Sequence, residues 1–238
     1  MSSPYPIDRL DTHDVKNQPP TLEMFDRFGS DQALVDAVTK AGGGVHLDRL
    51  GAFGRKTGSS EIIGWGDTAN RNPPVLETHD RQGRRIDEVQ FHPAYHKLMA
   101  LGFDEGVAAA AWDGTEAGHV LHAALSFLLG QVDAGTGCPM TMTYASVAAL
   151  KLDPDTGGEW IKRIVSSAYD PDVRPSREKR GVTIGMAMTE KQGGSDVRAN
   201  TTRAEPADGA YRLTGHKWFC SAPMSDAFLT LAYTEKGL

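Results

Sequence analysis

The stretch Gly185-Met-Ala-Met-Thr-Glu-Lys-Gln-Gly-Gly-Ser-Asp196 leads from a β-leaning run into a glycine-rich turn that carries hydroxyl and carboxylate groups. The run, residues 181–188, has the length expected of a buried strand. Gly193 and Gly194 allow positive φ and close backbone approach, so successive N–H groups can form a nest, and Ser195 adds a hydroxyl donor. The turn therefore predicts a site for an anionic or carbonyl-rich cofactor.

A second motif, Thr214-Gly-His-Lys-Trp-Phe-Cys-Ser221, follows the turn. Either motif alone is weak, since a Gly-Gly-Ser-Asp turn is an ordinary loop in most proteins, and Trp218 and Phe219 are of types more often found in a core. In this order and after helices, the pair resembles the acyl-CoA dehydrogenase family, and within it the AidB-like branch, flavoproteins of the alkylation-damage response. The resemblance covers nearly all of this chain and the front half of the family's.

The resemblance implies an α+β fold, with an N-terminal α-helical bundle followed by the beginning of an antiparallel β domain. It implies FAD as the cofactor, although neither of the common nucleotide fingerprints is present. Aligned on Gly215 and Lys217, Phe219 takes the place of the family's ring-stacking Trp, and Ser221 that of its flavin-edge Thr. The implied flavin-contacting residues are Met186, Met188, Thr189, Gly193, Gly194, Ser195, Phe219, Cys220 and Ser221.

The resemblance also implies a reaction, the α,β-dehydrogenation of an acyl-CoA or similar substrate, in a homotetramer. In the family a Glu of the C-terminal bundle removes the α-proton while hydride passes to FAD. That Glu lies beyond residue 238, so no catalytic residue is assigned here, and the chain alone is expected to be inactive. The alternative is a damage-response protein in which FAD is largely structural and the partner is DNA or another protein.

Composition and charge narrow these alternatives. The 25 Lys and Arg against 31 Asp and Glu give a formal net charge of −6, the wrong sign for a stand-alone DNA binder. The basic cluster at 174–180 is more typical of a solvated loop. No run approaches the roughly 20 apolar residues that cross a bilayer, and the start lacks the features of a secretory signal. We therefore expect a cytoplasmic protein with Cys138 and Cys220 as free thiols.

Three regions are predicted along the chain. Residues 1–30, rich in Pro, Asp and Asn, are expected to form an extended arm over a neighbour; residues 31–180 a helical domain; and residues 181–238 the incomplete start of the central β domain. Residues 58–90 are expected to be loop-rich. Helices are predicted from about residue 31 to 41 and over 46–56, 93–101, 106–111, 117–134, 142–150 and 157–169, and a hairpin turn at Ala207-Asp-Gly209.

The other carboxylates, histidines and threonines that could serve a functional site also have structural interpretations. Glu190 and Asp196 flank the glycine turn, and we expect them to accept backbone N–H bonds rather than act as an acid/base pair. The pairs His92/His96 and His119/His122 have helical spacing, but helix-start, hydrogen-bonded or surface roles are favoured over metal binding. The segment Cys138-Pro-Met-Thr-Met-Thr143 could contribute Thr141 or Thr143 to a cofactor or substrate cavity, or form an interhelix loop packed by its methionines.

Overall fold

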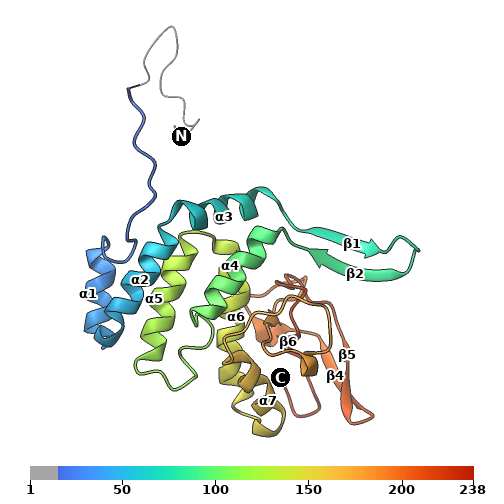
Figure 1. The fold of residues 1–238 in the computed structure, drawn as a ribbon. Coiled ribbons are helices and arrows are strands. Elements are labelled where there is room, and N and C mark those ends of the chain that lie inside the picture. The colour runs from blue at the N-terminus through green and yellow to red at the C-terminus, as the bar shows by residue number, and fades with distance from the viewer. Residues whose placement is uncertain (1–15) are drawn as a thin grey trace.

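The computed structural model describes residues 16–238 and places a layer of helices beside a group of short strands (Figure 1). The predicted α+β class, with the helical bundle first, is confirmed by the likeness to solved relatives given below. The helices are α1 (Gln32–Lys40), α2 (Leu47–Thr57), α3 (Ser60–Arg71), α4 (Pro93–Asp104), α5 (Gly118–Gly130), α6 (Ala134–Leu150) and α7 (Pro154–Ile164). The strands are β1 (Val75–His79), β2 (Arg85–Gln90), β3 (Ile184–Ala187), β4 (Arg203–Ala207), β5 (Ala210–Thr214) and β6 (Ala227–Thr230).

The predicted N-terminal arm lies partly outside the described residues, which begin at residue 16. Residues 16–24 are exposed and form neither helix nor strand. In Figure 1 this segment runs away from the helices. Docking of the arm over a neighbour stays a prediction.

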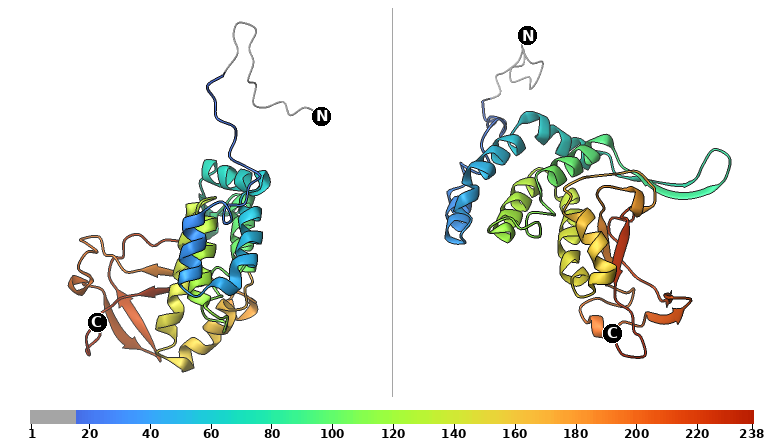
Figure 2. Two further views of the ribbon diagram at one scale, coloured as in Figure 1. Left: turned by 90° about the vertical axis from the view of Figure 1, so that its left-hand side faces the viewer. Right: turned by 60° about the horizontal axis from the view of Figure 1, so that its bottom comes forward.

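Helix α5 forms the centre of the bundle. It is apolar around much of its surface, and Leu121, Leu125 and Leu128 are completely buried. It lies against α1, α2 and α6, as the two views of Figure 2 show. A helix that is hydrophobic on nearly all sides is stable only when other helices surround it, so α5 organises the packing of its neighbours.

The expectation of a loop-rich segment at 58–90 is wrong. Ser59 begins α3 by accepting a hydrogen bond from the backbone N–H of Ile62, and β1 and β2 form an antiparallel hairpin around residues 80–84. The glycines of α3 conceal the helix in the sequence. Gly66 is required there because a Cβ would lie 2.3 Å from the carbonyl oxygen of Val132.

Four helix predictions also need correction. The helix predicted over 157–169 is α7, which begins at Pro154 and ends at Ile164. Residues 106–111 form hydrogen-bonded turns rather than a helix, beginning at Gly106 with φ +82°. The long helix predicted over 117–134 ends at Gly130, and the next begins at Ala134 instead of 142. Asp133 causes this break, because its carboxylate accepts a hydrogen bond from the backbone N–H of Thr136 and so caps α6. The Cys138–Thr143 segment is therefore helical.

The strands form two small pairings after residue 180. Strands β4 and β5 form the predicted antiparallel hairpin, and Asp208 and Gly209 have φ values of +49° and +79°, as a two-residue hairpin turn requires. Strand β3 pairs with β6 in parallel, so this pair departs from the antiparallel expectation. The first motif begins within β3, and the long connection from β3 to β6 contains the rest of it and the whole second motif.

A second core joins the helical region to the strands. Val147 and Ile164 from α6 and α7 pack with Val182 and Ile184 at β3, and all four are buried. Nearby, the ammonium of Lys179 lies 2.7 Å from the carboxylate of Asp226, with both side chains about 5% exposed or less. The apolar contacts fix β3 against the helices, and the ion pair joins Asp226, just before β6, to the segment that precedes β3.

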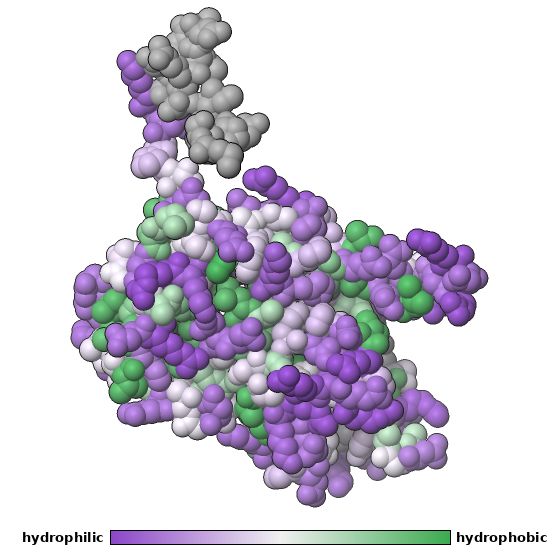
Figure 3. All heavy atoms as spheres, viewed as in Figure 1, coloured by the Kyte–Doolittle hydropathy of each residue, from purple (hydrophilic) through white to green (hydrophobic). Residues whose placement is uncertain are grey.

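The surface is mostly polar on the face shown in Figure 3. The β1–β2 hairpin is an exception, because Val75, Leu76 and Ile86 are exposed on it. Within residues 16–238, no helix has the length and apolar character needed to span a membrane.

Candidate functional site

The turn after β3 is closed by a reciprocal pair of backbone hydrogen bonds. The N–H of Glu190 donates to the carbonyl of Gly193 at 3.1 Å, and the N–H of Gly193 donates to the carbonyl of Glu190 at 3.0 Å. Gly194 follows in close contact with Thr189, because a Cβ on Gly194 would lie 2.6 Å from the Thr189 Oγ1. The turn is therefore tight, and a side chain at residue 194 would disturb the Thr189 hydroxyl.

The predicted nest at this turn is wrong in two respects. Neither Gly193 nor Gly194 is among the glycines with positive φ. The N–H of Gly193 is already bonded inside the turn, so it does not point at a ligand. Gly194 serves close packing against Thr189, while hydroxyl groups supply side-chain donors at the turn.

The carboxylate of Glu190 lies at the centre of the motif and is almost completely buried. It accepts hydrogen bonds from the backbone N–H groups of Thr201 (2.7 Å) and Thr202 (2.8 Å), from both threonine hydroxyls and from the amide of Gln192. Burial alone would raise the pKa of Glu190, but the hydrogen bonds from Thr202, Thr201 and Gln192 outweigh it and hold the pKa well below its ordinary value.

These contacts confirm the structural interpretation of the two carboxylates. Glu190 holds the turn to the segment before β4, and Asp196 accepts a hydrogen bond from the backbone N–H of Arg198 at 3.1 Å. A carboxylate that accepts this many hydrogen bonds is held in its ionised form. Glu190 is thus a fixed anion and not a proton carrier.

The two sequence motifs lie against each other. The backbone N–H of Trp218 donates to the carbonyl of Thr189 at 2.9 Å. The ammonium of Lys217 lies 3.3 Å from both the carbonyl oxygen of Met188 and the carboxylate of Glu190. The flavin-contacting segments that the resemblance implies therefore form one continuous edge.

Three hydroxyls on this edge are available to a ligand. Thr189, Ser195 and Ser221 come from the turn and from the second motif. Within residues 16–238, the bonds formed by Thr189 and Ser221 use backbone atoms, and their side-chain oxygens and that of Ser195 form none. Hydroxyls both donate and accept, so they suit the carbonyl oxygens and nitrogens of a flavin ring or its pyrophosphate. The donor set of the edge fits FAD.

The side chains after Trp218 lie open to solvent. Phe219 is 74% exposed and has φ +60°, and Ala222 has φ +53°. Cys220 is exposed, and Ser221 is half-buried with its N–H bonded to the carbonyl of Phe219. Positive φ is unfavourable for residues with a side chain, so this short segment holds two unfavourable conformations next to the edge.

The two threonines assigned to a cavity have different surroundings. Thr141 is exposed on α6. Thr143 is completely buried, its hydroxyl donating to the carbonyl of Pro139 at 2.7 Å and accepting from the N–H of Ile184 at 3.0 Å. Thr143 therefore ties α6 to β3.

A cavity of about 600 Å³ opens beside this edge. It lies between the first turns of α6 and the segment 221–223, and it is mostly apolar. Cys138 and Ser221 lie on its wall. Cavities of this size and character commonly bind small organic ligands. Its further lining comes from Ala69, Asn70, Asn72, Pro73, Pro74, Val89, Phe91, His92, Tyr95, Asp133, Ala134, Gly135, Pro139, Ala222 and Pro223.

The histidines have the local roles favoured from the sequence. His92 caps α4 by accepting a hydrogen bond from the N–H of Ala94, and His96 bonds the hydroxyl of Tyr169 at 2.7 Å. His119 and His122 both contact Tyr144, the first by a hydrogen bond and the second by stacking. The sequence did not indicate the Lys179–Asp226 ion pair, because no local pattern joins residues so far apart.

Comparisons with known proteins agree with this arrangement. Residues 185–238 match the model of the acyl-CoA dehydrogenase middle domain, and residues 17–171 match that of the adaptive response protein AidB N-terminal domain. The chain is 48% identical to AidB of Escherichia coli strain K12 over 95% of its own length and 43% of that protein. It therefore belongs to the acyl-CoA dehydrogenase family, in the AidB-like branch.

More distant relatives show the same fold. Acyl-CoA dehydrogenase family member 11 of Caenorhabditis elegans is 33% identical over 77% of this chain and 30% of its own length. Its crystal structure, ACDH-11 with C11-CoA, has a TM-score of 0.75 and 28% identity over 91% of this chain and 37% of that one. The apo form of Bd2924 has a TM-score of 0.78 and 31% identity, and the match covers 90% of this chain and 43% of that one. The chain spans less than half the length of these relatives.

Proposed function

We propose that this chain forms the flavin-contacting edge and part of the substrate wall of an FAD-dependent acyl-CoA dehydrogenase-type oxidoreductase. The observation that carries the proposal is the hydrogen bond between Trp218 and Thr189, which joins two motifs that are each weak alone. Thr189, Ser195 and Ser221 would hold the cofactor with their free hydroxyls. Met186, Met188, Gly193, Gly194, Phe219 and Cys220 would complete the contact surface.

The protein's own residues act by orientation. Glu190 and Lys217 fix the backbone of the edge, so its donors need no rearrangement when a ligand arrives. When bound, FAD supplies the hydride acceptor for α,β-dehydrogenation of an acyl-CoA. The apolar cavity beside Ser221 would take an acyl group and exclude water from it, with Cys138 and the first turn of α6 as its wall.

This chain spans less than half the length of its relatives. We therefore propose, for the whole protein, dehydrogenase activity, an acyl-CoA substrate and a tetrameric assembly. We propose that residues 1–238 bind FAD without turning over. Anaerobic mixing with acyl-CoAs of several chain lengths tests whether the bound flavin turns over. Bleaching of the flavin would contradict the proposed absence of turnover. Analytical ultracentrifugation tests the assembly.

Flavin binding is tested by adding FAD to the purified chain and recording visible absorption after removing the free cofactor. A bound-flavin spectrum supports the proposal, and no uptake contradicts it for this chain. Thr189→Val and Ser195→Ala should each weaken binding. Thr39→Val, on the surface of α1, is the matched control that should leave FAD affinity unchanged.

A second candidate function follows from the match to the adaptive response protein AidB N-terminal domain. In that case FAD is structural and the partner is DNA or a protein. The net charge of −6 disfavours DNA for this chain. Fluorescence anisotropy of labelled duplex DNA at low and moderate salt distinguishes the two candidate functions. Salt-sensitive binding would favour the DNA-binding role.

A further inference from the structure

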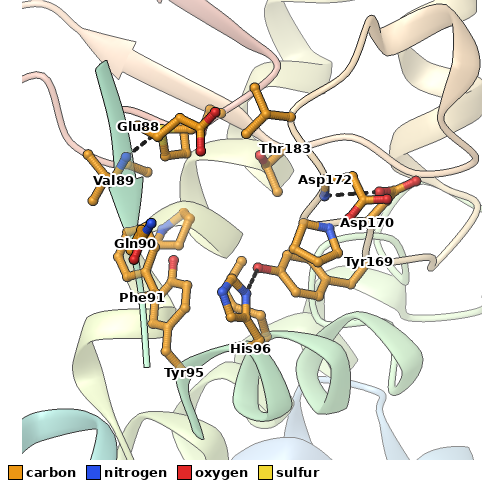
Figure 4. A pocket seen from close by; sticks show the side chains of 17 residues that line it. Glu88, Val89, Gln90, Phe91, Tyr95, His96, Tyr169, Asp170, Asp172 and Thr183 are labelled. Atoms are coloured by element: carbon orange, nitrogen blue, oxygen red, sulfur yellow. Dashed lines mark hydrogen bonds between the residues drawn. The ribbon is translucent and has the colours of Figure 1, made fainter. Parts of the chain in front are cut away.

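A second cavity lies next to the apolar one and differs from it in chemistry. Its volume is about 390 Å³, and it is enclosed by β2, α4 and the segments 169–173 and 222–225 (Figure 4). Phe91, Tyr95 and Pro139 line both cavities and form part of the wall between them. The smaller cavity is outside the proposed flavin edge, since none of the nine assigned residues lines it.

Carboxylates determine the charge of this cavity. Glu88, Asp170 and Asp172 line it, and its lining includes no Lys or Arg. Arg174 lies within ion-pair distance of both Asp170 and Asp172, so these two share one positive charge. Within residues 16–238, no ion pair is recorded for Glu88. The group therefore has two uncompensated negative charges.

The β1–β2 hairpin independently indicates that a positive charge would be favourable near this cavity. Glu88 on β2 is directly opposite Glu77 on β1, and residues opposite each other in an antiparallel pair place their side chains on the same face. Like charges in this arrangement destabilise a hairpin. A positive charge held near Glu88 would relieve the repulsion.

Aromatic rings form the floor of the cavity. Tyr95 stacks on Phe91 with ring centroids 4.1 Å apart, and His96 donates to or accepts from the hydroxyl of Tyr169. Figure 4 shows Tyr95, His96 and Tyr169 at one side of the space and Glu88 at the other. Burial lowers the pKa of His96, which disfavours a positive charge on this ring. Ring faces and carboxylates together favour organic cations.

We propose that the cavity lined by Glu88, Tyr95, Tyr169 and Asp172 binds a small organic ammonium ion. The aromatic floor accommodates its apolar groups by cation–π and dispersion contacts, and the carboxylates balance its charge. Ser225, whose buried hydroxyl has no hydrogen-bond partner within residues 16–238, provides an additional acceptor at the wall. An acyl chain or a free carboxylate would meet two uncompensated negative charges there.

The test is a saturation-transfer NMR titration of the full chain with choline, beside its neutral isostere 3,3-dimethyl-1-butanol. Choline should bind saturably, and the isostere at least about tenfold more weakly, equivalent to ~1.4 kcal/mol. Glu88→Gln should weaken choline binding by a similar factor, and Asp172→Asn should weaken it in the same direction. Glu235→Gln, an exposed carboxylate elsewhere, should leave it unchanged.

Several outcomes would overturn the proposal: no saturable choline binding in the millimolar range, equal affinity for the isostere, or unchanged affinity in both cavity variants. Displacement of choline by octanoate would also overturn it, because the cavity would then accept an acyl chain. Both variant sites are at least partly exposed, so loss of the fold is not expected; a thermal melt of each variant checks this. The titration needs neither flavin nor acyl-CoA, so its result is independent of the proposed function.

Discussion

The backbone N–H of Trp218 donates to the carbonyl oxygen of Thr189 at 2.9 Å. This single bond joins the turn after β3 to the second motif. Below it, the carboxylate of Glu190 contacts Lys217 from one motif and Thr202 from the segment that precedes β4. The edge proposed to contact FAD is therefore held together by a buried anion.

Replacing that anion should loosen the whole edge. In Glu190→Gln, one of the two carboxylate oxygens becomes an NH₂ group. That NH₂ then faces the backbone N–H of either Thr201 or Thr202, which bond different oxygens in the wild-type chain. Buried donors without acceptors are destabilising. We expect a clearly lower urea midpoint and weaker FAD uptake. Asp196→Asn, at an exposed carboxylate of the same loop, should change the midpoint little; equal effects would contradict the assigned role of Glu190.

The lowered pKa of Glu190 predicts that the free energy of unfolding depends on pH. Because the folded-state pKa of Glu190 is lowered, its contribution to stability is fully present above the unfolded value of about 4.3 and is lost as the pH falls through the folded value. Between pH 7 and 3 the free energy of unfolding of the wild-type chain should fall more steeply than that of Glu190→Gln. Parallel curves from urea titrations would contradict this account.

Neighbouring glycines in the turn should differ in their tolerance of a methyl group. A Cβ on Gly194 would lie 2.6 Å from the Thr189 Oγ1, whereas a Cβ on Gly193 would have no neighbour within 4 Å. Gly194→Ala should cost roughly 1–3 kcal/mol, the usual range for overpacking, and should displace the Thr189 hydroxyl. Gly193→Ala serves as the matched control. Denaturant unfolding and FAD titration measure both effects, and similar results for the two variants would refute the close contact.

Helix α3 provides a second glycine pair. Gly66→Ala would place its Cβ 2.3 Å from the carbonyl of Val132, while Gly64→Ala would meet nothing within 4 Å. The first should destabilise the protein by roughly 1–3 kcal/mol. The second should stabilise it by roughly 0.5–1 kcal/mol, since Ala is the better helix former. Opposite shifts in the thermal midpoint are the expected observation.

The buried pair of Lys179 and Asp226 should matter more than exposed pairs. Lys179→Ala leaves an uncompensated carboxylate beside the backbone N–H of Thr183, and breaking a buried pair from one side costs about 3–5 kcal/mol. Arg177→Ala removes an exposed pair with Glu178, for which about 0–1 kcal/mol is expected. A small loss for Lys179→Ala in chemical denaturation would indicate that water reaches the pair.

Local patterns predicted much of the structure. The hairpin turn at Asp208 and Gly209 and the α4 start at Pro93 each have signals within a few residues, and so do the two motifs at 185–196 and 214–221. The structural role of Glu190 also followed from its place beside a tight turn. These predictions succeeded because short-range hydrogen bonding determines turns and caps.

Features that depend on distant contacts could not be predicted in this way. Gly66 in helix α3 is explained only by its packing against Val132, and the parallel pairing of β3 with β6 joins segments about forty residues apart. Positive φ at Gly193 and Gly194 was inferred from residue type, which permits that conformation without requiring it. The acidic cavity is formed by several segments that are far apart in the sequence, so it has no continuous sequence pattern.

Thr143 connects helix α6 to strand β3 through one hydroxyl, and Ile184 beside it belongs to a core shared with α6 and α7. The two regions that meet near residue 180 would therefore be poor candidates for separate expression. A split placed there would leave an unpaired amide on one fragment and bare hydrophobic surface on both, so their recombination would behave as folding rather than as docking.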